Sequence, residues 1–434
     1  MPITDCRGKV AQVDYLPRVV DAEIASLLAG LPAVSIDGPK GVGKTATASR
    51  IARTIIQLDD PDEVSLLAAD KNRFKTSAKP ILLDEWQRYP YSWDMVRRSV
   101  DDGAAVGTFL LTGSATPREP THSGAGRIVR LRMRPMAMDE RGLEPATVSF
   151  SELLAGTRPG ISGTSILVLD DYADQVTRSG LPGIRALPDQ YRRPALDGYL
   201  DRIVEHDFVE LGHVVRRPAA LRAWLTAYAA ATATSASYET ILSAATPGIG
   251  DKPSRATAIA YRDTLTRLWI LDQVPAWLPT RSPMTALAQA PKHFLADPAL
   301  AARLLGVGAG RLVTQPNPGK VVVGDGPLLG RLFENLVALT VQVHAQTRGA
   351  RVAHLRTLRG DHEIDFIVER DDGKVLAVEA KLTNVPSDRD AKHLNWLAAQ
   401  IGDALVDAVI LTAGTFAYRR ADGVAVVPLS LLGA

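Results

Sequence analysis

The chain of 434 residues is about three times the length of a common domain, which predicts two to four domains. Hydrophobic residues make up 46% of it and charged residues 23%, a composition typical of a globular protein with enough apolar material for several cores. The net charge of only +2 argues against an overwhelmingly basic, nucleic-acid-coating chain. The single cysteine, Cys6, excludes an internal disulfide and a cysteine-rich zinc site.

The beginning of the sequence does not have the pattern of a targeting segment. It lacks the basic and apolar regions of a signal peptide, and no run in the chain approaches the ~18 apolar residues needed to span a bilayer. We therefore expect a cytoplasmic protein that does not insert into a membrane. The 50 basic residues divide into 12 Lys and 38 Arg, an imbalance typical of a genome whose codons favour arginine.

The first third of the chain alternates short apolar runs with helical patterns, which is typical of an α/β unit with a parallel sheet. The predicted strands are Ala33–Asp37, Pro80–Asp84, Thr108–Thr112 and Ile128–Arg132, and the predicted helices are Lys44–Gln57 and Trp93–Asp102.

A glycine-rich loop follows the first predicted strand and opens the first predicted helix. It fits the pattern G-x-x-x-x-G-K-[ST] in full. The glycines let successive N–H groups face phosphate oxygens, and the helix N-terminus adds the positive end of its dipole. Lys44 is expected to reach the β- and γ-phosphates of ATP, and the Thr45 hydroxyl to ligate Mg²⁺. The predicted nucleotide-binding residues are Gly38, Pro39, Lys40, Gly41, Val42, Gly43, Lys44 and Thr45.

Two carboxylates follow the next apolar strand, in the sequence Ile81-Leu82-Leu83-Asp84-Glu85. Asp84 is expected to hold the metal through water, and Glu85 to orient or deprotonate the attacking water. The presence of Glu85 favours hydrolysis over nucleotide storage. A third apolar strand ends in Thr112-Gly113-Ser114, and the hydroxyl of Ser114 or Thr112 is predicted to lie near the γ-phosphate.

An arginine on a loop of small residues could complete the site. Arg127 follows His122-Ser123-Gly124-Ala125-Gly126, and we predict that it reaches the transition-state phosphate in cis or from a neighbouring subunit. Arg130, Arg132 and Arg134 are expected to be solvated or paired with carboxylates along a strand, and His122 to cap a turn.

The middle of the chain has mostly helical patterns that end in the order of a winged helix. The helices Ala219–Ala233, Tyr238–Ala245 and Ser254–Arg267 precede an apolar run, Leu268–Leu278. Residues 215–282 hold eight basic and four acidic residues, a local charge of +4. Two interpretations stay open: a module that contacts DNA, or a structural or oligomer-contact module. The stretch Leu278–Lys292 is predicted to be a linker.

The last part of the chain contains a predicted strand hairpin around Asp371-Asp372-Gly373. Strand alternation places Asp365 on one face of its strand, and Glu379 with Lys381 on one face of the next. Such a convergence of charges is costly unless a divalent cation or a reaction uses it.

These residues suggest a metal site. Asp365 and Glu379 could hold Mg²⁺ or Mn²⁺, while Lys381 orients or activates a water. Glu334, in an otherwise apolar helix pattern, could point to the same place. The set Glu, Asp, Glu-x-Lys resembles the PD-(D/E)xK nucleases, although the proline that precedes the aspartate in that family is absent here. The last domain has 15 basic and 15 acidic residues, so charge does not indicate a surface that grips DNA.

Taken with Tyr15-Leu16-Pro17-Arg18 and the Leu111–Ala115 and His122–Arg127 motifs, the chain resembles bacterial and archaeal P-loop ATPases of the AAA+/STAND-related type. Members of that group carry a C-terminal domain of unknown function with a PD-(D/E)xK-like core. The resemblance implies an α/β protein that binds and hydrolyses ATP with Mg²⁺. It implies three domains: an AAA+-like P-loop ATPase domain with a helical extension (1–215), a winged-helix-like domain (216–282) and a nuclease-like domain (293–434).

Three functions are compatible with this sequence. The first is a homo-oligomeric ATPase that acts on DNA or is regulated by it through its winged-helix and nuclease-like domains. The second is a signalling or scaffold ATPase whose nuclease-like domain is a degenerate module that binds protein. The third is a metal-dependent nuclease regulated by ATP.

Overall fold

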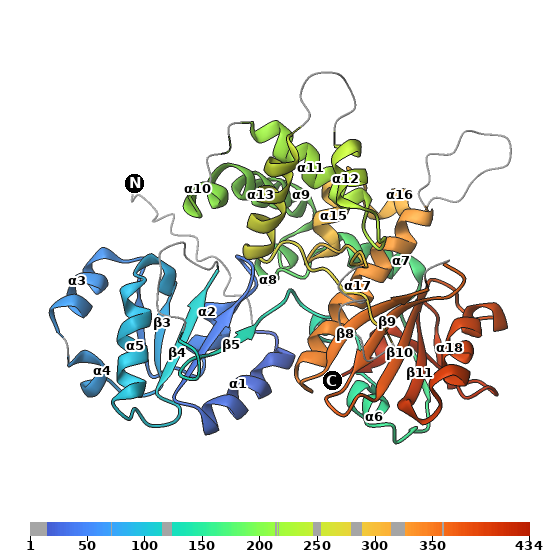
Figure 1. Ribbon diagram of the computed structural model, residues 1–434, viewed down its shortest axis with the longest axis horizontal. Helices are drawn as coiled ribbons and strands as arrows, with labels where there is room; N and C mark the ends of the chain where they lie inside the picture. Colours follow the sequence, from blue (N-terminus) through green and yellow to red (C-terminus); the bar gives the residue numbers. More distant parts are fainter. Residues whose placement is uncertain are drawn as a thin grey trace, which may run out of the picture.

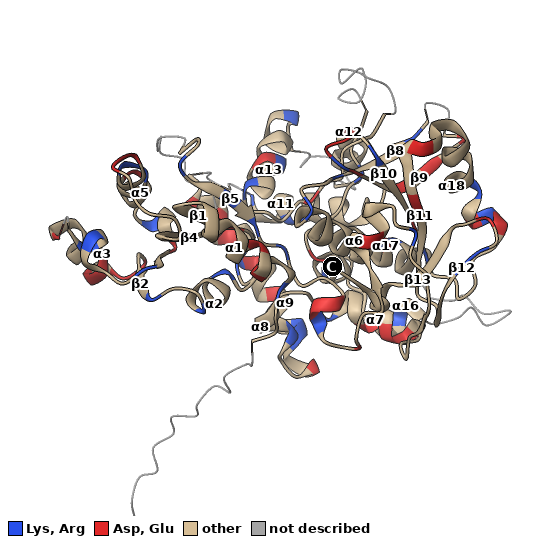
Figure 2. Ribbon diagram, turned by 90° about the horizontal axis from the view of Figure 1, so that it is seen from below, with Lys and Arg blue, Asp and Glu red and all other residues tan. Residues whose placement is uncertain are grey.

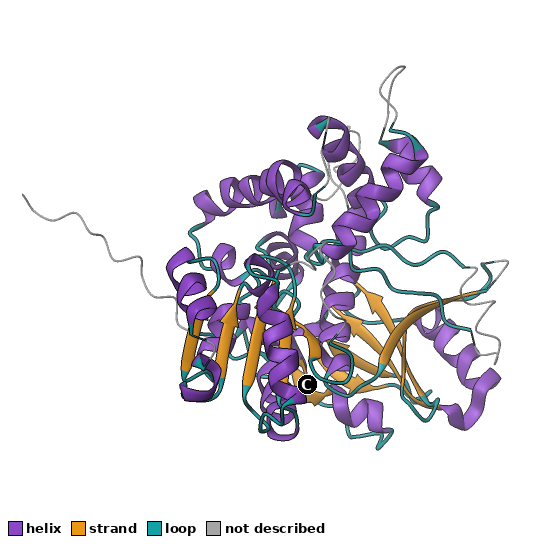
Figure 3. Ribbon diagram, turned by 60° about the vertical axis from the view of Figure 1, so that its left-hand side comes forward, coloured by secondary structure: helices purple, strands orange, loops and turns teal. Residues whose placement is uncertain are grey.

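The computed structural model describes residues 15–70, 72–114, 124–212, 215, 217–245, 253–278, 289–313, 326–357 and 360–434. Figure 1 shows two sheets at opposite sides of the molecule, with a group of helices above and between them. The same division into helical and sheet-containing parts is visible in Figure 3. No helix in the described ranges is both long and apolar enough to cross a membrane.

The N-terminal unit is a five-stranded parallel sheet with the order β2-β3-β4-β1-β5. Helices cover both faces, so the central strands are buried on both sides and read as continuous apolar runs. The elements are α1 (Val19–Gly30), β1 (Ala33–Asp37), α2 (Lys44–Ser49), β2 (Thr54–Gln57), α3 (Pro61–Ala69), α4 (Arg73–Thr76), β3 (Ile81–Asp84), η1 (Trp86–Arg88), α5 (Tyr91–Asp101), β4 (Phe109–Gly113) and β5 (Val129–Arg132).

One predicted helix of this unit is wrong in its second half. The helix predicted over Lys44–Gln57 ends at Ser49, and Thr54–Gln57 form the edge strand β2, paired with β3. The run Thr54-Ile55-Ile56 consists of β-branched residues, which fit a pleated strand better than a helix.

The helical region follows the first sheet and occupies the top of Figure 1. Near its start, the short strands β6 and β7 pair with strands from the C-terminal part of the chain. The elements are η2 (Asp139–Arg141), β6 (Val148–Ser149), α6 (Phe150–Ala155), β7 (Gly163–Thr164), α7 (Leu169–Thr177), α8 (Pro182–Arg185), α9 (Asp189–Arg202), the π-helical turn η3 (Ile203–Asp207), α10 (Phe208–Glu210), α11 (Pro218–Ala230), α12 (Tyr238–Ala244), α13 (Arg255–Arg267), α15 (Pro298–Leu304) and α16 (Ala309–Val313).

Where a wing was predicted, the apolar run after α13 makes only isolated bridges among the described residues. Leu271 pairs with Leu295 and Val274 with Lys292, both antiparallel. The predicted linker therefore ends in a residue, Lys292, that is buried and paired.

The C-terminal unit is a seven-stranded mixed sheet with the order β7-β12-β13-β11-β10-β9-β8. The predicted hairpin is present as the antiparallel pair β9 and β10. The elements are α17 (Gly326–Gln346), β8 (Arg351–Arg356), β9 (Glu363–Glu369), β10 (Val375–Lys381), α18 (Asp388–Ile401), η4 (Gly402–Ala404), β11 (Leu405–Thr412), β12 (Phe416–Arg419), β13 (Ala425–Pro428), η5 (Leu429–Leu431) and β14 (Leu432–Gly433).

The helical region and the C-terminal sheet share one apolar core, which extends from Met138 to Leu432. Segment 143–165, placed in the ATPase domain by the sequence prediction, contributes to it, because β6 pairs with β14 and β7 with β12. The helix α17 lies in this core and also reaches the N-terminal sheet, where the Gln346 amide donates to the Arg132 carbonyl at 2.8 Å.

Candidate functional site

The predicted phosphate loop connects β1 to α2 at the carboxyl edge of the first sheet. Gly41 and Gly43 have φ values of 74° and 102°, a region in which side chains other than glycine are strained. A Cβ atom on Gly38 would lie 2.2 Å from the Met133 carbonyl oxygen. The loop therefore needs its glycines both for its curvature and for its close approach to the backbone at Met133.

Lys44 is folded back against this loop. Its ammonium donates to the carbonyl oxygens of Gly38 and Pro39, each at 2.9 Å, and the residue is 5% exposed. Burial lowers the pKa of Lys44 to about 8, against the opposing effect of nearby carboxylates such as Glu85. The ammonium is thus held at the loop by carbonyl contacts that phosphate oxygens could replace.

The Mg²⁺ residues predicted from the sequence are in contact with each other. The Thr45 hydroxyl donates to Asp84 Oδ1 at 2.8 Å, and the Thr112 hydroxyl donates to the same oxygen. Thr112 is fully buried, so its contact fixes the Asp84 carboxylate from the side of β4. Hydroxyl and carboxylate oxygens are the ligands that Mg²⁺ prefers, so Thr45 and Asp84 fit the ion that accompanies ATP.

Glu85 stands next to this pair in a strained conformation. Its φ of 53° is left-handed, which is uncommon outside glycine and often found at functional positions. The carboxylate accepts from the Gln87 amide and, at 3.3 Å, from the Ser114 hydroxyl. Gln87 also donates to Ser114 at 3.1 Å. Gln87 was missed from the sequence, because an amide two residues after a carboxylate carries no motif.

Two further contacts of the loop were not predicted. Arg18, 6% exposed, donates to the Val42 carbonyl at 2.9 Å and pairs with Glu140 at 3.2 Å. Lys40 pairs with Asp207 at 2.7 Å and with Glu210 at 2.8 Å, in η3 and α10. The loop is therefore tied on one side to the chain before α1 and on the other to the helical region.

Arg127 lies at the amino-terminal ends of the strands of the first sheet, opposite the ends that carry the phosphate loop. It precedes β5, which runs parallel to β1, and it pairs with Asp101 at the end of α5 at 2.8 Å. The phosphate loop follows the opposite end of β1, about 17 Å away at 3.3 Å per strand residue. This placement does not fit action in cis, whereas the half-exposed side chain is accessible to another molecule. His122 lies outside the described residues.

The three other arginines of this segment make ion pairs. Arg130 pairs with Asp37 at 2.5 Å. Arg132 and Arg134 pair with the buried Asp272, at 2.8 and 2.9 Å. The last two pairs join the end of β5 to the bridge-forming segment after α13.

We expect Asp272→Ala to lower the free energy of unfolding by about 3–5 kcal/mol, because it leaves two guanidinium groups without their buried partner. Burial raises the pKa of Asp272, but Arg132 and Arg134 outweigh it, so the pKa is below the ordinary value. The stabilisation is therefore complete above that ordinary value and is lost as the pH falls through the lower, folded-state pKa.

Urea denaturation of Asp272→Ala beside the exposed control Asp263→Ala, at neutral pH and at about pH 3, measures this effect. The difference from wild type should be large at neutral pH, shrink in acid, and be near zero for Asp263→Ala. Equal stability of wild type and Asp272→Ala at neutral pH would contradict the role of these pairs.

The four residues predicted for the C-terminal metal site do come together. Asp365 and Glu379 lie on the paired strands β9 and β10, and Asp365 accepts from the Ala380 N–H at 2.9 Å. Lys381 pairs with Glu379 at 2.7 Å. Glu334 reaches the same place from α17.

A fifth residue, Lys292, occupies the centre of this group. Its ammonium is 2.6 Å from Glu334 and 2.8 Å from Asp365, with Glu363 at 3.6 Å. The Lys292 side chain is 3% exposed. In the described part of the chain, no set of three or more His, Cys, Asp or Glu side chains is arranged to hold a metal ion. The arrangement is an ion-pair network, with an ammonium among the carboxylates predicted to bind metal.

The pKa directions differ among the members of this network. Burial opposes the charge on Lys292, but Asp365 and Glu334 outweigh it and raise its pKa. Burial raises the pKa of Glu334 to about 8 and that of Glu379 as well, with the Asp365 charge adding to both effects. Asp365 stays ionised, because Lys292 and Lys381 hold its pKa low against burial.

Three family models match consecutive parts of the chain. Residues 31–141 match an AAA domain, residues 169–311 match a domain of unknown function (DUF8612), and residues 329–432 match another domain of unknown function (DUF4143). The AAA match contains the phosphate loop, Asp84, Glu85, Ser114 and Arg127. The DUF4143 match contains Glu334, Asp365, Glu379 and Lys381.

Two mycobacterial proteins are similar over most of the chain. They are the uncharacterized proteins Mb2031c of Mycobacterium bovis and Rv2008c of Mycobacterium tuberculosis, each 27% identical over 423 residues, covering 94% of this chain and 82% of theirs.

Solved structures show weaker similarity. The Walker-type ATPase PABY2304 of Pyrococcus abyssi is 16% identical, with a TM-score of 0.39 over 69% of this chain and 99% of that one. The ORC2 protein of Aeropyrum pernix is 17% identical, with a TM-score of 0.32 over 68% and 94%.

The AAA match and the geometry of the phosphate loop agree. A parallel sheet, a complete glycine loop at its carboxyl edge and an acidic pair on the neighbouring strand lie within the matched residues. Residues 31–141 thus combine the fold and phosphate loop of a P-loop domain with a match to the AAA domain model, and they precede two regions that match domain families of unknown function.

Proposed function

We propose that the protein is a Mg²⁺-dependent ATPase whose nucleotide state is transmitted to its helical region and which acts on DNA or is regulated by it. The observation that carries the ATPase proposal is the position of Glu85. Its carboxylate is held by Gln87 and Ser114, next to the Thr45–Asp84 pair, where an attacking water would need a base.

The residues of the loop would act in turn when ATP binds. The Lys44 ammonium exchanges the Gly38 and Pro39 carbonyls for phosphate oxygens, while the backbone N–H groups of the loop surround the phosphates. Thr45 and Asp84 would hold Mg²⁺, which neutralises charge on the β- and γ-phosphates when bound. Glu85 then orients the water and accepts its proton.

Contacts of the loop with the helical region support transmission. Lys40 pairs with Asp207 and Glu210, and the Tyr199 hydroxyl donates to the Lys40 carbonyl at 3.1 Å. Glu210 also pairs with Arg88, three residues after Glu85. Phosphate charge at the loop competes with these carboxylates for Lys40, so nucleotide binding is expected to shift α9 and η3.

The DNA part of the proposal rests on the helices that follow. If the three helices act as a winged helix, α13 is the recognition helix, and its Arg255 side chain is 80% exposed. Arg262 lies on the same helix, where it pairs with the adjacent Asp263 and lies over the Tyr238 ring. Figure 2 shows basic and acidic residues interspersed over the described chain, so any DNA contact would be local.

DNA-stimulated ATP hydrolysis at low salt tests this proposal. Double-stranded DNA should raise the rate in wild type, and Arg255→Ala with Arg262→Ala should remove the stimulation while leaving the basal rate unchanged. Rates that are equal with and without DNA or RNA, at about 50 mM salt, would contradict the DNA role but not the ATPase.

A second candidate is an ATPase with a protein partner, and Lys292 favours it. An ammonium among the carboxylates of the nuclease-like cluster fits a degenerate module better than a cleaving one. Metal-dependent cleavage that disappears in Asp365→Ala would contradict this candidate and support the ATP-regulated nuclease.

For Arg127 we predict action from a neighbouring subunit. Arg127→Ala and Glu85→Gln should each lose ATPase activity, and mixing the two variants should restore part of it, because a mixed oligomer contains sites with both groups intact. The rate of the mixture is compared with the sum of the separate rates. A mixture that is no more active than this sum would count against a role in trans.

A further inference from the structure

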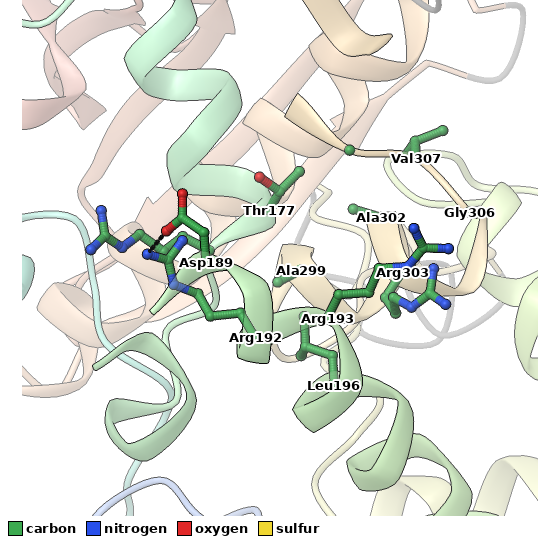
Figure 4. A pocket seen from close by; sticks show the side chains of 12 residues that line it. Thr177, Asp189, Arg192, Arg193, Leu196, Ala299, Ala302, Arg303, Gly306 and Val307 are labelled. Atoms are coloured by element: carbon green, nitrogen blue, oxygen red, sulfur yellow. Dashed lines mark ion pairs between the residues drawn. The ribbon is translucent and has the colours of Figure 1, made fainter. Parts of the chain in front are cut away.

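A cavity of about 230 Å³ lies in the helical region, away from the phosphate loop and from the C-terminal cluster. It is lined by the end of α7, the first half of α9, and α15 with the turn that follows it, as Figure 4 shows. Four arginines line it: Arg178, Arg192, Arg193 and Arg303. No residue of the predicted ATPase or nuclease-like sites is among its walls.

The four arginines differ in the ion pairs that neutralise their charge. Arg303 is fixed by two contacts with Asp197, at 2.5 and 2.9 Å. Arg192 pairs with Asp189, whose side chain is 86% exposed, and its Nε also donates to the Leu187 carbonyl at 2.8 Å. Arg178 is 3.5 Å from the half-exposed Asp174. Pairs this exposed are worth at most about 1 kcal/mol, so an incoming anion can replace them.

Arg193 has no hydrogen bond or ion pair with any residue in the described ranges. Four arginines face three aspartates, which leaves an excess of one positive charge at the cavity. The floor is apolar, with Leu196, Ala299 and Ala302 each no more than 3% exposed. Low polarisability beneath the guanidinium groups strengthens their attraction for an anion.

From this arrangement we propose that the cavity is a binding site for a small multivalent oxyanion of the pyrophosphate class. Guanidinium groups bind phosphate oxygens in bidentate fashion, and several oxygens are needed to engage arginines that come from three helices. The volume is below the ~300–1,000 Å³ of pockets that enclose drug-sized ligands, which favours a phosphate group over a whole nucleotide.

The proposal does not depend on ATP hydrolysis. The test uses the Lys44→Ala protein, so that the phosphate loop does not compete with the cavity for pyrophosphate. Calorimetric titration of the full chain carrying Lys44→Ala with pyrophosphate, without ATP, should show binding. Adding Arg193→Ala should weaken that binding about tenfold or more, the effect expected from one lost charge-assisted contact. Arg193 is exposed and unpaired, so its removal should leave the melting temperature unchanged.

The matched control is Arg389→Ala, which removes another exposed arginine, from α18, and should leave pyrophosphate binding unchanged. Absence of pyrophosphate binding in Lys44→Ala, or equal binding after Arg193→Ala, would overturn the proposal. So would an Arg193-dependent affinity for an oligonucleotide with none for pyrophosphate.

Discussion

Glu85→Gln is expected to bind ATP as tightly as wild type and to hydrolyse it at least a hundredfold more slowly. The carboxylate is the only feature that the substitution changes, because glutamine keeps the size of the side chain and can still contact Gln87 and Ser114. Loss of a general base in this position costs typically 10²–10⁴ in rate. Lys44, Thr45 and Asp84, the residues predicted to bind ATP and its Mg²⁺, are untouched.

Steady-state phosphate release and equilibrium binding of ATP, measured on the same preparation, separate the two effects. Glu205→Gln, an exposed carboxylate in η3, is the matched control and should hydrolyse ATP as wild type does. A Glu85→Gln protein with an unchanged turnover rate would show that another group activates the water. A parallel loss of ATP binding would show that Glu85 is structural.

Lys292→Met should destabilise the protein by about 3–5 kcal/mol. The substitution leaves Glu334 and Asp365 as buried neighbours without the ammonium between them, and removal of one partner from a buried ion pair has this cost. Combining Lys292→Met with Glu334→Gln and Asp365→Asn should recover much of the loss, because neutral amides then replace the buried carboxyl groups that the ammonium contacted.

Denaturation in urea measures both effects, with the exposed Lys374→Met as the matched control. Wild type should unfold at the same urea concentration in EDTA and in Mn²⁺, since Lys292 already neutralises the cluster. Clear stabilisation of wild type by Mn²⁺ would contradict this interpretation and favour a metal centre. An unchanged stability of Lys292→Met would show that the cluster does not need its ammonium.

The first sheet and the phosphate site were predictable because their signals are local. Ala33–Asp37 begins and ends where the sequence places it, and the hairpin predicted around Asp371-Asp372-Gly373 is present, since these strands are apolar runs bounded by turn residues. The edge strand Thr54–Gln57 was missed because only its pairing with β3 distinguishes it from the end of a helix. The return of segment 143–165 to the last sheet depends on pairings more than 250 residues apart in the chain, which no local pattern contains.

The role of Lys292 could not be predicted from the residues next to it in the sequence. Lys292 ends a stretch predicted to be a linker, and its role depends on partners 42 to 73 positions away. One compositional signal was available. In a chain with 38 Arg and only 12 Lys, the residues Lys40, Lys44 and Lys292 occupy positions where a compact ammonium contacts two or more oxygens.

The central claim is that the glycine loop binds ATP for hydrolysis. The most direct measurement is ATP hydrolysis by the full chain in Mg²⁺, compared with Lys44→Ala at equal concentration. The account predicts turnover in wild type, loss of at least 99% of it in Lys44→Ala, and an unchanged melting temperature without nucleotide. A wild-type rate no higher than that of Lys44→Ala, in a folded protein with and without DNA, would contradict it.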